Sequence, residues 1–162
     1  MNILIPALAA ALLFSFAGAW AHEDARHPAK GGVATEVVEK PFGRFADPKR
    51  AICTIKVDMR DTMRFSPARL TVKRGETVRF VVTNSGKTMH EMVLGTMYEL
   101  KDHAELMRKF PGMEHDEPYM AHVRPGRTET LAWQFTKAGE FFYGCLIPGH
   151  FEAGMVGKIV VR

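Results

Sequence analysis

The chain has 162 residues, a formal net charge of +4 and 46% hydrophobic residues. This length suits one domain, and this apolar content can fill a buried core, so wholesale disorder is excluded. The Lys and Arg residues form no cluster with interleaved aromatics. The sequence therefore predicts no nucleic-acid binding, and its mild basicity equally suits docking on an acidic protein partner.

The first 21 residues carry no charged side chain. An apolar run from Ile3 to Phe16 is followed by small residues that offer two cleavage sites, Ala17-Gly18-Ala19 and Ala19-Trp20-Ala21. This pattern predicts that residues 1–21 are a secretory signal peptide and that no membrane span remains after cleavage. No Lys or Arg precedes the run, and the alternative is a retained anchor.

Residues 22–50 are rich in Ala, Gly, Pro and charge, without sustained periodicity. We expect a flexible N-terminal arm with an edge strand near Ala34–Val38. From Ala51 the pattern changes, and apolar residues alternate with polar ones over the segment that begins at Cys53. Since a period of two is typical of a half-buried strand, the folded domain is predicted to span residues 51–162.

Short strands with turn signals between them follow along the rest of the chain. The expected strands are Arg69–Val72, Thr77–Thr83, His90–Leu94, Thr128–Phe135, Glu140–Tyr143 and Gly157–Val161. One stretch, Glu99–Phe110, has apolar residues at near-helical spacing and is ended by Pro111-Gly112. The sequence thus predicts an all-β sandwich with one short helix inserted between strands.

One loop combines three kinds of copper ligand. Cys145, His150 and Met155 follow each other at five-residue intervals, and His90 begins an upstream strand. A Cys thiolate, two imidazoles and a long axial thioether are the ligands of a type 1 copper site. Each residue has a plainer alternative: Cys145 pairing with Cys53 in a disulfide, a strand-end or surface His, and a Met that only fills the core.

The spacing Cys-x4-His-x4-Met, with an upstream His and a terminal strand, resembles the cupredoxin family, rusticyanin and auracyanin in particular. The resemblance covers residues 51–162 and implies an eight-stranded Greek-key sandwich with copper at one end. It also implies that His150 is the ligand nearest to solvent. The segment from Lys109 to Pro118 is similar to the periplasmic copper-tolerance cupredoxins of Gram-negative bacteria, which implies a periplasmic location.

Methionine and histidine also gather outside this loop. Met113, His115, Met120 and His122 bracket a Pro-containing segment after the predicted helix, and thioether with imidazole suits Cu(I) capture. We regard these four residues as a candidate second copper site. The alternative is that the methionines are core filler.

Three functions remain open from the sequence. The protein is an electron carrier, a copper-tolerance protein that binds or hands on copper, or a sandwich interaction module with a Cys53–Cys145 disulfide. No His flanks Cys145 and no Ser/His/Asp or paired-carboxylate site stands out, so we expect no enzymatic activity. The expected partners are redox or copper-handling proteins of the periplasm. The protein itself is expected to be a monomer.

Overall fold

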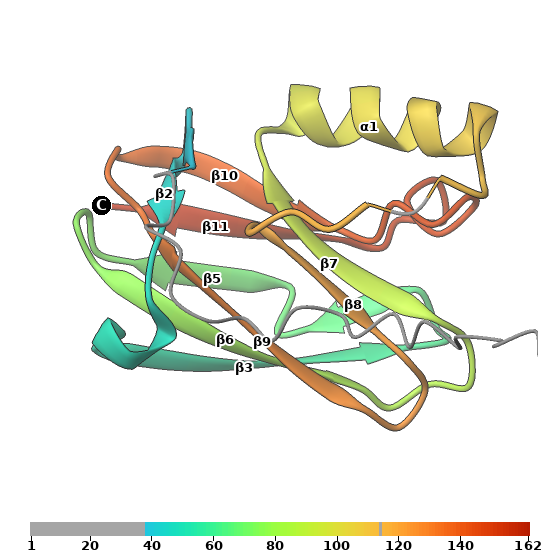
Figure 1. Ribbon diagram of the computed structural model, residues 1–162, viewed down its shortest axis with the longest axis horizontal. Coiled ribbons are helices and arrows are strands. Elements are labelled where there is room, and N and C mark those ends of the chain that lie inside the picture. The colour runs from blue at the N-terminus through green and yellow to red at the C-terminus, as the bar shows by residue number, and fades with distance from the viewer. Residues whose placement is uncertain (1–37, 114) are drawn as a thin grey trace, which may run out of the picture. The chain divides into compact units, whose positions relative to one another are not determined.

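Two β-sheets face each other in the structure, a computed structural model that describes residues 38–113 and 115–162 (Figure 1). The first sheet has the order β1 (Glu39–Lys40), β2 (Gly43–Phe45), β9 (Thr128–Gln134), β6 (Thr77–Asn84), β3 (Cys53–Arg60) and β4 (Arg64–Ser66). The second has the order β5 (Arg69–Val72), β11 (Val156–Val161), β10 (Gly139–Gly144), β7 (His90–Gly95) and β8 (Met120–Val123). The predicted all-β sandwich is confirmed, with more strands than the eight expected.

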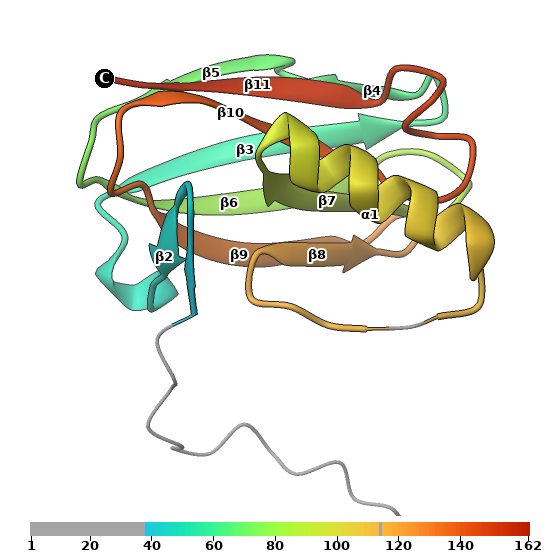
Figure 2. The ribbon, with the colours of Figure 1, turned by 90° about the horizontal axis from the view of Figure 1, so that it is seen from above.

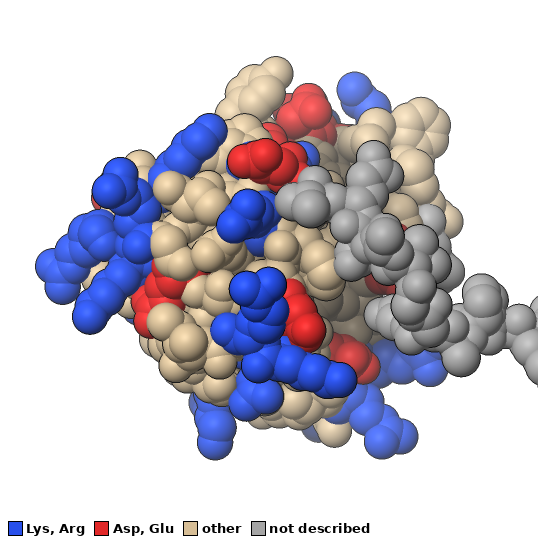
Figure 3. Space-filling model, turned by 60° about the vertical axis from the view of Figure 1, so that its left-hand side comes forward, with Lys and Arg blue, Asp and Glu red and all other residues tan. Residues whose placement is uncertain are grey.

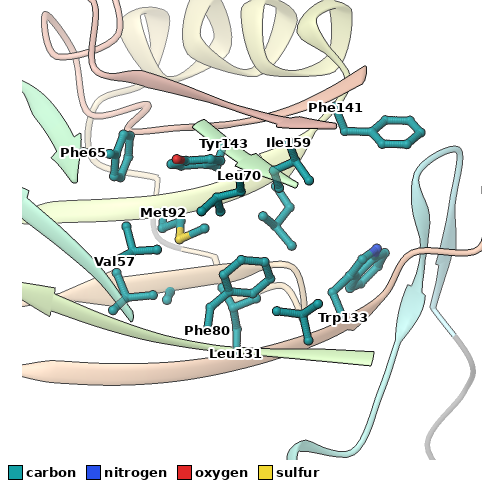
Figure 4. Close-up of a cluster of buried hydrophobic side chains, with 14 of the residues drawn as sticks. Val57, Phe65, Leu70, Phe80, Met92, Leu131, Trp133, Phe141, Tyr143 and Ile159 are labelled. Carbon is teal, nitrogen blue, oxygen red and sulfur yellow. The ribbon is translucent and has the colours of Figure 1, made fainter. Parts of the chain in front are cut away.

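The space between the sheets is filled by side chains that alternate along the strands (Figure 4). Val57 and Phe80 from the first sheet meet Tyr143 and Ile159 from the second, and all four are at most 1% exposed. Complete burial of one such side chain stabilises the fold by about 1.5–3 kcal/mol. This core holds the two sheets in fixed relation and therefore fixes the loops at their ends.

The sheet begins before residue 51. Residues 39–45 form β1 and β2, β2 pairs with β9, and the short helix η1 (Pro48–Arg50) follows. Phe42, between β1 and β2, is fully buried in the core. The expected flexible arm is thus wrong for residues 39–50, because burial of Phe42 anchors this hairpin. The predicted signal peptide and the edge strand up to residue 37 lie outside the described residues.

Helix α1 (Met97–Lys109) lies on the outer face of the second sheet, over β7 and β10 (Figures 1 and 2). Thr96 and Glu99 form a capping box at its start, with reciprocal side-chain to backbone hydrogen bonds. Leu100, Ala104 and Met107 form its buried face. Since α1 covers one face of β7 and the core covers the other, β7 is buried along its whole length.

The helix differs in detail from its prediction. It begins at Met97, two residues before the predicted Glu99, and Phe110 is its C-cap. Leu106 and Phe110 are 44% and 57% exposed, so they do not belong to the buried face. Among the described residues, no helix is long and apolar enough to cross a membrane.

The charged side chains are mixed in sign over the face shown in Figure 3, where Asp and Glu lie between groups of Lys and Arg. Elsewhere in the described residues, oppositely charged side chains form ion pairs, such as Lys158 Nζ with Glu140 Oε2 at 2.8 Å. Exposed pairs of this kind contribute little to stability, about 0–1 kcal/mol. The burial of the core therefore dominates the energetics of this fold.

Candidate metal centre

Three side chains with metal-binding atoms meet at one end of the sandwich. His90 begins β7, while Cys145 and His150 lie in the loop that joins β10 to β11, at the right-hand end in Figure 1. Their ligand atoms all lie within 4.8 Å of one another. Within residues 38–113 and 115–162, no other group of three His, Cys, Asp or Glu side chains meets this criterion.

The distances within this group fit one metal ion. Cys145 Sγ lies 3.3 Å from His150 Nδ1 and 4.0 Å from His90 Nδ1. A trigonal site with metal–sulfur and metal–nitrogen bonds of about 2.3 and 2.0 Å needs a sulfur–nitrogen separation of about 3.7 Å. The two observed distances lie on either side of that value. One thiolate and two imidazole nitrogens are a donor set that suits copper.

Cys145 is fully buried, and its sulfur accepts a hydrogen bond from the backbone N–H of Glu91 at 3.4 Å. Burial raises the pKa of the Cys145 thiol to about 12. The thiol therefore keeps its proton at neutral pH until a cation takes the proton's place. The hydrogen bond from Glu91 then helps to hold the charge of the thiolate.

His90 is oriented by a carboxylate behind it. Its Nε2 lies 3.2 Å from Asp61 Oδ1 and 3.4 Å from Thr88 Oγ1. Hydrogen bonds from the Lys87 backbone N–H, and from the side chain and backbone of Thr88, hold the pKa of Asp61 well below its usual range. The anionic Asp61 favours the His90 tautomer with the proton on Nε2, which leaves the Nδ1 lone pair facing Cys145.

The position of Asp61 also explains why residue 86 is a glycine. A Cβ atom at Gly86 would collide with the Asp61 carboxylate. Asp61 directly follows the end of β3, and Gly86 lies in the turn after β6. Because β3 and β6 are parallel neighbours, Asp61 and Gly86 lie at the same end of the sheet, where Asp61 contacts His90.

His150 is half-buried, in contrast to the fully buried His90. Gly149 has a φ of +90°, which only glycine adopts readily, and the His150 backbone N–H then bonds back to the Ile147 carbonyl at 2.9 Å. Burial and the neighbouring His90 lower the pKa of His150. Its imidazole is therefore neutral at pH 7 and available to a metal.

Met155 is fully buried and belongs to the same core cluster as Cys145. The Cys145 backbone N–H donates to the Met155 carbonyl at 3.1 Å, and the Met155 N–H donates to the His150 carbonyl at 3.0 Å. These bonds close the loop on itself. Axial ligation by the Met155 thioether stays a prediction.

Glu91 is a residue of the site that sequence reasoning missed. It is 2% exposed; its Oε1 accepts a hydrogen bond from the Leu146 backbone N–H at 2.8 Å, and its Oε2 lies 3.1 Å from His122 Nδ1. The hydrogen bond with Glu91 raises the pKa of His122. A carboxylate inside an apolar strand, next to a candidate ligand, was the signal available in the sequence.

The predicted second copper site does not form from its four residues. Both ring nitrogens of His122 are already engaged, Nδ1 by Glu91 and Nε2 by the His115 carbonyl at 3.0 Å. Met113 is 39% exposed, and Met120 is buried in the small cluster beneath α1. His115 instead faces His103, which the sequence analysis did not single out.

The alternative of a Cys53–Cys145 disulfide is also wrong, because both thiols are free. Cys53 begins β3, and Asp61 follows the end of that strand beside the metal centre. Eight residues of extended chain span about 26 Å, which is far beyond the reach of a disulfide.

Comparison with known proteins agrees with this geometry. Residues 51–162 match the family described as copper binding proteins, plastocyanin/azurin family. The chain belongs to this family. It is therefore a cupredoxin, and copper is the metal to which its three converging side chains are suited.

Two relatives of this cupredoxin are copper-resistance proteins by name. The copper-resistant cuproprotein CopI of Rubrivivax gelatinosus is 52% identical over 163 residues, covering 99% of this chain and 98% of the relative. The protein of the same name from Pseudomonas aeruginosa is 36% identical over 150 residues, covering 75% and 82%.

Solved structures share the fold at lower identity. The auracyanin of Roseiflexus castenholzii has a TM-score of 0.60 and 20% identity, covering 69% of this chain and 98% of its own. Auracyanin A of Chloroflexus aurantiacus has a TM-score of 0.58 and 24% identity, covering 67% and 98%. These likenesses support the cupredoxin fold that the sequence resemblance implied.

Proposed function

We propose that this cupredoxin is a periplasmic copper-tolerance protein that holds one copper ion as a type 1 centre. His90, Cys145 and His150 supply the main ligands, and Met155 supplies the axial one. The observation that carries the proposal is the buried Cys145 thiol between two imidazole nitrogens, 3.3 and 4.0 Å away. The end-to-end similarity to the copper-resistant cuproprotein of Rubrivivax gelatinosus supports the tolerance role.

Each residue has a defined task in this centre. When bound, copper would supply one-electron redox chemistry between Cu(I) and Cu(II). The buried Cys145 thiol gives up its proton and becomes the soft ligand, and the Glu91 N–H holds the resulting charge. Asp61 keeps the Nε2 proton on His90, so Nδ1 stays free to ligate.

The surrounding shell favours tight retention of copper. Cys145, His90 and Met155 are fully buried, so water has no direct path to three of the four proposed ligands. Only His150 is half-exposed. A copper ion held in this way is kept from unspecific reactions at the surface, as tolerance requires.

Copper titration of the purified protein, followed by its visible spectrum, tests the centre. We expect an intense thiolate-to-copper absorption band whose intensity reaches its maximum when the type 1 site is filled. The Cys145→Ser variant should lack the band, and the matched Cys53→Ser variant should keep it. Absence of the band in the unaltered protein would overturn the proposed centre.

Growth on copper tests the tolerance role. A strain that lacks the gene should be sensitive to copper and should be rescued by the unaltered protein and by Cys53→Ser. Rescue by Cys145→Ser would show that tolerance does not depend on the type 1 centre. Export to the periplasm is checked in the same strains by fractionation.

Electron transfer is the second candidate function. The half-exposed His150 favours it, because an imidazole at the surface offers a partner protein a short route to the metal. Met89, next to His90, is 38% exposed and adds an apolar contact point. If the protein is an electron carrier, its partners are redox proteins. If it is a copper-tolerance protein, its partners are copper-handling proteins. Fast, reversible electron exchange with no copper-sensitive phenotype would favour the carrier.

A further inference from the structure

Two imidazole rings outside the type 1 centre face each other, one from the middle of α1 and one from the segment after it. His103 lies on α1, and His115 lies in the segment that runs from the end of α1 towards β8 (Figure 2). Their Nε2 atoms are 2.8 Å apart, and their ring centroids are 4.8 Å apart with an interplanar angle of 38°. Each ring thus presents a nitrogen to the same point in space.

We propose that His103 and His115 form a second copper site, which holds Cu(I) between their two Nε2 atoms. The proposal deepens the copper-tolerance function and rests on it, but the site uses none of the type 1 ligands. It replaces the four-residue set that the sequence suggested and keeps only His115 from it.

The two rings are suited to a metal in their protonation state. Burial lowers the pKa of His103, and the charge of His115 would lower it further, while Glu91, Asp102 and Glu117 oppose this effect. A neutral His103 keeps a lone pair for a metal at pH 7. The same carboxylates favour a cation placed beside the ring.

One ring nitrogen of this pair is unusual. His115 Nδ1 is buried and has no hydrogen-bond partner. Buried polar atoms in native proteins nearly always have a partner, so an orphaned one indicates a site that is optimised for something other than stability. In the metal-free pair one Nε2 must donate its proton to the other. Both nitrogens can ligate once that proton moves to Nδ1 of the same ring, and no proton leaves the pair.

The small number of donors favours Cu(I). In the part of the chain that the structure describes, no third His, Cys, Asp or Glu atom joins this pair within 4.8 Å. Zinc prefers four ligands in a tetrahedron, and Cu(II) also prefers a larger set. Cu(I) accepts two nitrogen ligands in line, so a pair of facing imidazoles is sufficient for it.

The pair must open to admit the ion. Two metal–nitrogen bonds of about 2.0 Å in line need a separation of about 4 Å between the nitrogens, roughly 1 Å more than observed. His103 is fixed by the helix, whereas the described residues between α1 and β8 include no helix or strand. We therefore expect His115 to make the movement.

Anaerobic Cu(I) titration against a chromophoric Cu(I) chelator tests the proposal. The unaltered protein should bind one Cu(I) more than His103→Gln and one more than His115→Gln. The control variant Lys101→Gln, an exposed change on the same helix, should bind as much as the unaltered protein. Equal Cu(I) uptake by the unaltered protein and both His variants would overturn the second site.

Two further measurements separate this proposal from the type 1 centre. After loading with Cu(II), His103→Gln and His115→Gln should keep the full thiolate-to-copper band, which also shows that they are folded. Cys145→Ser should lose the band and yet keep the extra Cu(I) that depends on His103. Uptake of Zn²⁺ by the pair at equal affinity would overturn its assignment to Cu(I).

Discussion

The carboxylate of Glu91 accepts a hydrogen bond from the backbone N–H of Leu146 at 2.8 Å, and so ties the metal-binding loop to the strand that carries His90. The other carboxylate oxygen binds His122 on β8. Through one buried side chain, β7, β8 and the loop are held together next to Cys145.

Removal of this carboxylate should destabilise the fold. Glu91→Ala leaves the Leu146 N–H and the His122 ring without their partner, so we expect a loss of about 3 kcal/mol in the free energy of unfolding. Glu91→Gln keeps an acceptor for Leu146 and should lose less. Denaturant unfolding of the metal-free protein measures both. The exposed Glu105→Ala is the control and should change stability by no more than about 0.5 kcal/mol. Equal stability of Glu91→Ala and this control would contradict the assigned role.

Asp61 should set the copper affinity through His90. Asp61→Ala removes the acceptor that keeps the proton on His90 Nε2, and we expect copper affinity to fall about 10–100-fold. Competition with a chelator of known affinity measures the change. Asp47→Ala removes a different capping carboxylate, at η1, and should leave copper affinity unchanged. If both variants bind copper equally well, orientation by Asp61 is not needed.

Copper loading should release one proton per ion at pH 7. The pKa of the Cys145 thiol is about 12, so this group is protonated in the metal-free protein. The pKa of His150 is lowered, so its ring is already neutral and releases none. Proton release is read with an indicator in weak buffer. Copper affinity should also rise about tenfold per pH unit near neutrality. A loading reaction without proton release would show that the buried thiol is already ionised.

His122 and His103 should titrate on opposite sides of the ordinary histidine pKa of about 6.5. The hydrogen bond that the His122 ring donates to the Glu91 carboxylate raises the pKa of His122, while burial lowers that of His103. The His122–Glu91 pair therefore stabilises the fold fully below about pH 6.5, and this contribution is lost as pH rises through the folded pKa of His122. NMR titration of the ring protons measures both values, and Glu91→Gln should lower the pKa of His122 more than that of His103, because only His122 is hydrogen-bonded to Glu91. The reverse order of titration would be inconsistent with the observed contacts.

Much of the sandwich was predictable because its strands carry local signals. The alternation that starts at Cys53 predicted β3, and Pro111-Gly112 predicted where α1 ends. The start of α1 was placed two residues late because the capping box at Thr96 and Glu99 was not used. β8 was missed because three of its four residues are apolar and buried, so its sequence shows no alternation of apolar and polar residues.

Cys145 and His150 were predictable because they share one loop with Met155 at regular spacing, and His90 was predictable because it begins an upstream strand. The contacts around the ligands were not predictable, because they depend on pairing between segments that are distant in the sequence. Glu91 and His122 meet only because β7 and β8 are antiparallel neighbours in register. His103 and His115 meet because the chain reverses after α1, and their spacing of twelve residues indicates no contact by itself.

The position of Glu91 on β7 matters for attempts to move this centre into another protein. The segment from Cys145 to Met155 looks like a portable unit, since its own backbone hydrogen bonds close it. Yet its first turn is held from outside by a side chain 55 residues earlier in the chain. A grafted loop that arrives without a buried acceptor on the neighbouring strand would carry an unpaired amide next to the metal, and its recipient would need to supply a matching carboxylate and histidine.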